Sequence, residues 1–125
     1  MEDRDRRTLV DEMLAALDRR DAGAVMACMS DDVAGVDETT RSFVRGRGAM
    51  TEHLGAQLEA VSSVTSLISD WNETVVGEAA FATCVLHQSY VIGGDTITLV
   101  APTSFAFRVE DGAWRICLFH SVPLD

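Results

Sequence analysis

Residues 76–95 read VGEAAFATCVLHQSYVIGGD, a long run of β-favouring residues between two glycine turns. Gly77 stands in the first turn, and Gly93 and Gly94 stand in the second. Because glycine takes positive φ without steric hindrance, both turns suit tight hairpins. The run between them predicts a strand over residues 79–92. Short turns on both sides predict that this strand pairs antiparallel with its two neighbours.

The same alternation of apolar runs and turn signals continues on both sides of this stretch. It predicts strands over residues 64–76, 95–109 and 113–122, and the last hairpin turns at 110–112, Glu-Asp-Gly. Pro102 has no backbone N–H to donate to a neighbouring strand. The strand that contains it is therefore predicted to be bent, bulged or at a sheet edge at that point.

The first half of the chain has helical rather than extended periodicity. Apolar residues at i, i+3, i+4 and i+7 predict an amphipathic helix over residues 5–18, and Asp21 is a suitable N-cap for a short second helix. A third helix is predicted over residues 49–61, with His53 on it and partly exposed. Helices followed by an antiparallel meander predict a single α+β domain over residues 1–125.

Composition and charge narrow the class of protein. The chain has 125 residues and a net charge of −10, which opposes binding to a phosphate backbone, so we expect no nucleic acid partner. No apolar run approaches the roughly 20 residues of a membrane span, and we expect no membrane association. The N-terminus lacks the apolar core of a secretory signal, which predicts a cytoplasmic protein.

Cysteine and histidine usage points to the absence of a metal or other cofactor. Cys28, Cys84 and Cys117 are an odd number without a CxxC spacing, and they are predicted to be reduced core thiols. The three histidines have no metal-ligand spacing. We therefore expect neither a metal nor any other cofactor.

Asp37 closes a short apolar run, Val33 to Val36. A carboxylate at the end of a buried strand lies at the rim of any cavity that the strand walls, where a general base would be placed. Aspartate also favours strand ends and turns for purely structural reasons. The residues alone leave both roles open.

The ordered set of segments resembles the NTF2-like superfamily, nearest to its SnoaL-like polyketide cyclase and ketosteroid isomerase branches. The resemblance rests on AALDRRDAGAVMACMSDD at 15–32, RGRGAM at 45–50, EAAFA at 78–82, LVAPTSFAF at 99–107 and DGAWRICLFHS at 111–121. It implies a cone in which three N-terminal helices pack on a strongly curved antiparallel sheet. It also implies a homodimer formed through the sheet, and a small hydrophobic carbonyl compound bound in the cone.

The resemblance also implies roles for individual residues. Asp37 falls at the position of the isomerase base, which moves a proton between carbons of an enone. Met13 occupies the position of a tyrosine donor, and Ser104 occupies that of a protonated aspartic acid. A thioether cannot donate a hydrogen bond, and a serine hydroxyl is a weak substitute. The chain is therefore predicted not to be an efficient ketosteroid isomerase.

The SnoaL-like branch implies other proton-transfer chemistry, such as cyclisation or dehydration, with Asp37 as base and His87 as its helper. Aligned on EAAFA, the strand face that carries His87 corresponds to the cavity side. The last strand presents its odd-numbered residues to the cavity unless a bulge reverses it. The predicted ligand pocket comprises Met13, Leu17, Thr83, Val85, Ser104, Cys117, Phe119 and Ser121.

The alternative is a non-catalytic NTF2-like module for ligand binding or dimerisation. An enzyme is expected to enclose a pocket with Asp37 buried inside it and the pKa of Asp37 raised. A non-catalytic module is expected to have its cavity filled by Met13, Phe81 or Phe119. The state of the cavity therefore separates the two classes.

Overall fold

A computed structural model describes residues 5–122 of the chain. The four long strands lie close to their predicted positions: β3 Ser63–Val76, β4 Ala79–Ile92, β5 Asp95–Glu110 and β6 Ala113–Ser121. Each is joined to the next by one of the predicted tight turns, and Gly77, Gly93, Gly94 and Gly112 all have positive φ there. Turn chemistry therefore sets the strand boundaries in this half of the chain.

The first two helices begin within one residue of their predicted starts, whereas the third begins two residues before its predicted start. Helix α1 spans Arg6–Asp18, and the carboxylate of Asp5 accepts a hydrogen bond from the backbone N–H of Thr8 at 2.7 Å. Helix α2 spans Ala22–Ala27, and Asp21 caps it as predicted by accepting from the N–H of Ala24 at 3.1 Å. Helix α3 spans Arg47–Ala60 and follows Gly46, whose φ is +86°.

Strands β1 Met29–Asp37 and β2 Ser42–Arg45 complete the described fold. Over residues 5–122 the strands form one six-stranded sheet in the order β2-β1-β6-β5-β4-β3. Two features differ from the prediction. Strand β2 was not predicted, because it is short and largely exposed. The sheet is not wholly antiparallel either, because β1 runs parallel to β6.

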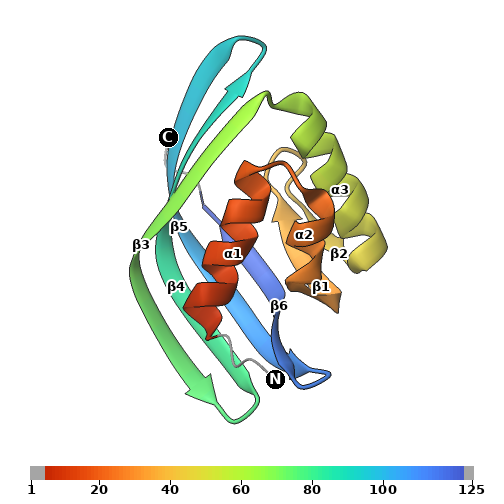
Figure 1. The fold of residues 1–125 in the computed structure, drawn as a ribbon, viewed down its shortest axis with the longest axis vertical. Helices are drawn as coiled ribbons and strands as arrows, with labels where there is room; N and C mark the ends of the chain where they lie inside the picture. The colour runs from red at the N-terminus through yellow and green to blue at the C-terminus, as the bar shows by residue number, and fades with distance from the viewer. Residues whose placement is uncertain (1–4, 123–125) are drawn as a thin grey trace.

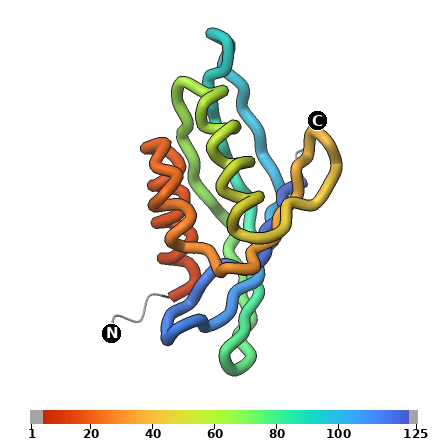
Figure 2. Tube along the Cα trace, turned by 90° about the vertical axis from the view of Figure 1, so that its right-hand side faces the viewer, coloured from red at the N-terminus to blue at the C-terminus, as the bar shows by residue number. Residues whose placement is uncertain are grey.

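The sheet is curved and not closed, and it wraps around α1 (Figure 1). Figure 2 shows α1 and α3 on the same, concave side of the sheet, and α2 contacts both of them. The register of β3 shifts between Ser69 and Asn72, where Asp70 takes a φ of +54°. A bulge of this kind bends a strand and increases its twist. It therefore contributes to the curvature that makes the cone.

Pro102 lies in β5, an inner strand, without breaking a sheet hydrogen bond. Its carbonyl accepts from the N–H of Val122 at 2.9 Å, so its backbone polar groups face β6. Strand β6 ends at Ser121, beside this point. The missing N–H therefore faces a local sheet edge, as the sequence predicts.

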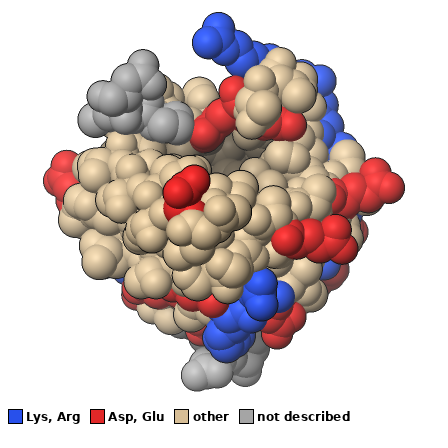
Figure 3. Space-filling model, turned by 90° about the horizontal axis from the view of Figure 1, so that it is seen from above, with Lys and Arg blue, Asp and Glu red and all other residues tan. Residues whose placement is uncertain are grey.

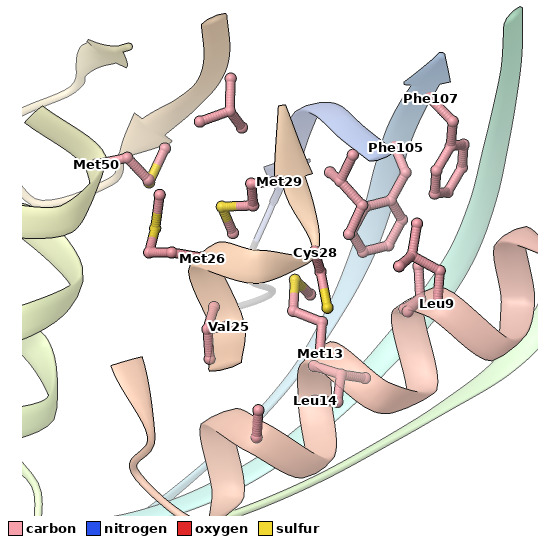
Figure 4. Close-up of a cluster of buried hydrophobic side chains, with 14 of the residues drawn as sticks. Leu9, Met13, Leu14, Val25, Met26, Cys28, Met29, Met50, Phe105 and Phe107 are labelled. Atoms are coloured by element: carbon pink, nitrogen blue, oxygen red, sulfur yellow. The ribbon is translucent and has the colours of Figure 1, made fainter. Parts of the chain in front are cut away.

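The buried core includes Leu9 and Phe107, with Trp71 packed against it, and it extends to Met50 and Leu54 of α3. We call the part around Leu9 and Phe107 the packed half. Leu9 and Ile116 are fully buried, and the rings of Phe105 and Phe107 stack at 5.9 Å (Figure 4). Trp71 approaches Phe107 at 6.3 Å with tilted rings, an arrangement that aromatic pairs favour. No described helix is both long and apolar enough to cross a membrane.

Side-chain contacts fasten both ends of α1 to the sheet. The guanidinium of Arg6 donates to both carboxylate oxygens of Glu73, at 3.1 and 2.9 Å, and lies 5.0 Å from the ring centre of Trp114. At the other end, Asp18 accepts from the N–H and the hydroxyl of Ser66, at 3.1 and 2.9 Å. These contacts fix α1 against the sheet at both of its ends.

Candidate functional site

A cavity of about 420 Å³ occupies the other half of the cone, which we call the open half. Its walls come from the end of α1, from α3, and from the concave faces of β4, β5 and β6. Seen from above in Figure 3, the molecule is hollowed here, with acidic side chains beside the hollow. The lining is mostly apolar, and its polar members are Asp37, Glu38, Thr39, His53, Gln57, Gln88, Tyr90, Thr103 and Ser121.

Asp37 and His53 form an ion-pair contact within this lining. The Oδ2 atom of Asp37 lies 3.8 Å from Nδ1 of His53, and the two side chains are 23% and 21% exposed. Asp37 ends β1, and His53 lies on the side of α3 that carries Met50 and Leu54 into the cavity wall. The pair therefore brings together two elements that are separate in the chain.

The other oxygen of Asp37 holds the turn between β1 and β2. Its Oδ1 atom accepts from the backbone N–H of Thr39 at 2.9 Å and of Thr40 at 3.3 Å. Burial raises the pKa of Asp37, but the hydrogen bonds from Thr40 and Thr39 and the nearby His53 together outweigh it. The pKa of Asp37 therefore lies below its ordinary value, opposite to the raised value expected of an enzymatic base.

Glu38 is the second carboxylate of the cavity wall, beside Asp37. Partial burial raises the pKa of Glu38, His120 opposes this shift, and the negative charge of Asp37 adds to it. The pKa values of these two neighbouring carboxylates are thus shifted in opposite directions. Asp37 is held in its charged form by hydrogen bonds, whereas Glu38 lies where a negative charge is less favourable.

Two hydroxyl groups face the cavity from the sheet. The hydroxyl of Thr103 donates to the carbonyl oxygen of Ala101 at 3.0 Å, and it also lies 2.8 Å from the hydroxyl of Ser121. Either hydroxyl can donate the bond between Thr103 and Ser121, and in both cases the oxygen of Ser121 remains able to accept.

Gly35 gives the cavity part of its width. A Cβ atom at this position would lie 3.1 Å from both the Met50 methyl group and the ring of Phe119. Phe119 and Met50 therefore occupy space next to β1 that a side chain at residue 35 would take. Both side chains also line the cavity.

Five of the predicted site residues lie together at this cavity: Asp37, Met13, Leu17, Phe119 and Ser121. Asp37 is more than half buried, as its position after an apolar strand predicts. The cavity is not filled by Met13 or Phe119, and Phe81 is 55% exposed on the other side of the sheet. The collapsed cavity considered as the alternative is therefore absent from the described part of the chain.

The predicted face of β4 must be corrected. Thr83, Val85 and His87 do not line the cavity, because their neighbours Cys84, Leu86 and Gln88 face inward. His87 instead places Nε2 2.9 Å from the hydroxyl of Ser69 at the outer surface. Both faces of β4 carry apolar residues, so a period of two does not identify the inner one.

Two more predicted pocket residues lie elsewhere. Ser104 pairs with Thr83 and His120 in neighbouring strands and is exposed on the convex face. The cavity-facing hydroxyl of β5 belongs instead to Thr103, one residue earlier. Cys117 does not line the cavity, because the β5–β6 register shifts next to it and leaves it without a partner in β5. This bulge lets both Ile116 and Phe119 point inward.

Several cavity residues were missed by the sequence interpretation, above all His53, Gln57 and Tyr90. For His53 and Gln57 the signal was present in α3, since His53 lies three residues after Met50 and four before Gln57. These spacings place Met50, His53 and Gln57 on one helix face. Among the described residues, no group of three His, Cys, Asp or Glu side chains is placed to hold a metal ion.

Comparison with known proteins assigns the fold family. The family model of the SnoaL-like domain matches residues 7–125, nearly the whole chain. The chain belongs to the SnoaL-like domain family. No curated protein matches the sequence.

Solved structures of the NTF2-like fold resemble this SnoaL-like domain at low sequence identity. An NTF2-like superfamily protein from Salmonella enterica has a TM-score of 0.84 at 19% identity, over 94% of this chain and 87% of its own. A ketosteroid isomerase-like protein from Erwinia carotovora has a TM-score of 0.81 at 18% identity, over 95% of this chain and 93% of its own. A proposed dehydratase of the NTF2-like family from Streptomyces avermitilis has a TM-score of 0.81 at 15% identity, over 93% of this chain and 91% of its own. At these identities the likeness establishes the fold alone.

Proposed function

We propose that this SnoaL-like domain binds a small hydrophobic carbonyl compound in its cavity and transfers a proton on it, as in an isomerisation, cyclisation or dehydration. The observation that carries the proposal is the Asp37–His53 pair in the wall of a largely apolar cavity. Apolar walls with a few converging polar groups are typical of small-molecule sites. A pair of titratable groups facing such a cavity is typical of acid–base catalysis.

Within this pair, His53 is the proton-transfer group and Asp37 positions it. The lowered pKa of Asp37 makes its carboxylate a weaker base than the sequence suggested. Imidazole ordinarily titrates near neutral pH, and a neighbouring carboxylate can orient the ring and stabilise its protonated form. The separation of 3.8 Å is longer than a hydrogen bond. Such contacts in ligand-free sites often shorten when the substrate binds.

The same site is poorly equipped for ketosteroid isomerisation. Met13 cannot donate a hydrogen bond, and the hydroxyl of Ser104 is on the outside of the sheet. Loss of a single oxyanion donor lowers the rate by about 10²–10³-fold. We expect a steroid enone assay to give little turnover, and a rate near that of an efficient isomerase would contradict this.

A hydrogen–deuterium exchange experiment tests the proton transfer directly. A naphthyl methyl ketone is added to the protein in D₂O, its binding is measured by fluorescence, and exchange of its methyl protons is followed by NMR. We expect binding with exchange faster than in buffer alone. His53→Gln should remove the acceleration while the ketone still binds. Glu52→Gln, an exposed neighbour outside the cavity lining, is the matched control and should behave as wild type.

The second candidate is a ligand-binding module without catalysis. It is favoured by the commitment of Asp37 Oδ1 to two backbone N–H groups, since that is a structural use of the carboxylate. The exchange experiment separates the two functions. Binding without acceleration would support the module and refute the proton transfer, whereas failure to bind would refute both.

We also propose a homodimer formed through the convex face of the sheet, in the cytoplasm. Leu67, Phe81 and Leu118 are 58%, 55% and 42% exposed on this face. Apolar side chains gathered on one face favour association. Light scattering at micromolar concentration should give the dimer mass, and Phe81→Glu should lower it to that of a monomer. A wild-type monomer would contradict the proposal.

A further inference from the structure

We infer that the compound bound in the cavity carries a protonated amine in addition to its apolar skeleton. This rests on the proposed function and makes its ligand class more specific. The first observation is the charge of the lining. Asp37 and Glu38 are both carboxylates, and no lysine or arginine is among the lining residues that the structure describes.

Arg45 and Arg47, which lead into α3, are engaged away from the cavity. Arg47 donates to the carbonyl oxygens of Met29 and Met26 at 3.1 and 3.0 Å, which ties α3 to the preceding elements. The guanidinium of Arg45 lies 4.5 Å from the ring centre of Phe43, outside the cavity lining. An anionic ligand would therefore meet two carboxylates without a compensating guanidinium.

The two carboxylates also repel each other. The charge of Asp37 and burial both make ionisation of Glu38 less favourable, whereas His120 opposes them with a larger effect than that of Asp37. A cation placed between a charged Asp37 and Glu38 would remove this repulsion. Because nearby apolar walls reduce solvent screening, such an attraction is stronger here than at an open surface.

The hydroxyl pair on the sheet also offers an acceptor. Whichever hydroxyl donates the bond between Ser121 and Thr103, the oxygen of Ser121 can still accept a hydrogen bond from a ligand. Acceptors therefore face the cavity from both the β1 end and the sheet wall. A protonated amine, which has only donors, is complementary to such a lining.

The test compares three ligands of one shape. A naphthyl methyl ketone carries on its far ring an aminomethyl, a hydroxymethyl or a carboxylate group, and each is titrated by calorimetry at about pH 8, so that an alkylamine stays protonated. We expect the amine to bind about tenfold more tightly than the alcohol, and the carboxylate about tenfold more weakly. Added salt should reduce the difference between amine and alcohol.

Two variants assign the preference to the carboxylates. Glu38→Gln and Asp37→Asn should each reduce the amine-to-alcohol affinity ratio severalfold and leave alcohol binding unchanged. Asparagine retains the oxygen that accepts from Thr39 and Thr40, so the turn is preserved. Glu52→Gln removes one exposed charge outside the lining and should not alter the ratio.

The outcomes separate this inference from the proposal on which it rests. If the alcohol binds and the amine binds no more tightly, the inference is wrong and the proposed function stands. An amine preference that survives both carboxylate substitutions would also overturn it. If none of the three ligands binds, the proposed function and the inference fail together.

Discussion

The packed half and the open half of the cone are made from the same strands but are filled differently. Around Leu9 and Phe107 the aromatic rings and the start of α1 leave no space, and the exposed fractions of these two residues are 0% and 1%. Around Asp37 and His53 the same sheet encloses a cavity of about 420 Å³. One half therefore stabilises the fold, while the other half is available for a ligand.

This division shows how a small domain can tolerate a cavity of this size. An unfilled apolar space lowers stability because its walls lack contacts on one side. The packed half, together with the Arg6–Glu73 contact, offsets that loss at the opposite end of α1. Substitutions in the two halves should therefore have different consequences for stability.

The largest difference is expected between two phenylalanines. Phe107→Ala removes a side chain from the packed half and should lower the free energy of unfolding by about 3–5 kcal/mol. Phe119→Ala removes a side chain that already borders the cavity. It should therefore lower the free energy of unfolding by roughly half of the loss in Phe107→Ala, or less. Urea denaturation of both variants measures the comparison.

A milder pair of substitutions is the control for this comparison. If Phe107→Ala does not fold, Phe107→Leu makes the same comparison with Phe119→Leu on a smaller scale. Equal losses at the two positions would mean that the two halves do not differ in packing.

A smaller effect is expected from the contact between Arg6 and Glu73. Their side chains are 17% and 27% exposed and make two parallel hydrogen bonds, so a double-mutant cycle to alanine should give a coupling of about 0.5–1 kcal/mol. The Arg7–Asp11 pair of the same helix is the control. The side chains of Arg7 and Asp11 are 44% and 55% exposed, and Nε of Arg7 lies 3.6 Å from Oδ2 of Asp11. This pair should give about half of the Arg6–Glu73 coupling or less. A coupling near zero for Arg6 and Glu73 would show that the packed half does not depend on this contact.

The smallest effect belongs to the open half and depends on pH. Because the folded-state pKa of Asp37 is lowered, its carboxylate contributes stability above its ordinary pKa of 3.8, and this is lost as the pH falls through the folded value. Asp37→Asn cannot titrate, so it should reduce the loss of stability on acidification relative to wild type. The free energy of unfolding at neutral and acidic pH measures this, and identical pH profiles would refute it.

The sequence predicted the strands of this molecule better than it predicted which face of each strand is inside. The turns at Gly77 and at Gly93–Gly94 fix where β4 begins and ends, because local backbone conformation determines a hairpin. The inner face of β4 depends on whether Leu86 or His87 meets the core, and that is decided by packing with distant helices. An apolar strand covered on both sides gives no local signal for this choice.

The candidate site shows the same limit. Asp37 was identified because its position depends on the strand immediately before it. His53 was predicted to be partly exposed, and it is, but its approach to Asp37 depends on how α3 packs against β1. The bulge beside Cys117 likewise depends on the pairing of β6 with β5. Contacts within one element were predictable, and contacts between elements were not.

Gly35 provides a way to adjust the size of the ligand that the cone accepts. The absent side chain leaves room for the ring of Phe119 and the methyl group of Met50, whose ends are flexible. A graded series of alanine, serine and valine at this position would push both groups progressively into the cavity while most of the packed half stays unchanged. Residue 35 is thus a natural starting point for redesigning substrate range within this scaffold.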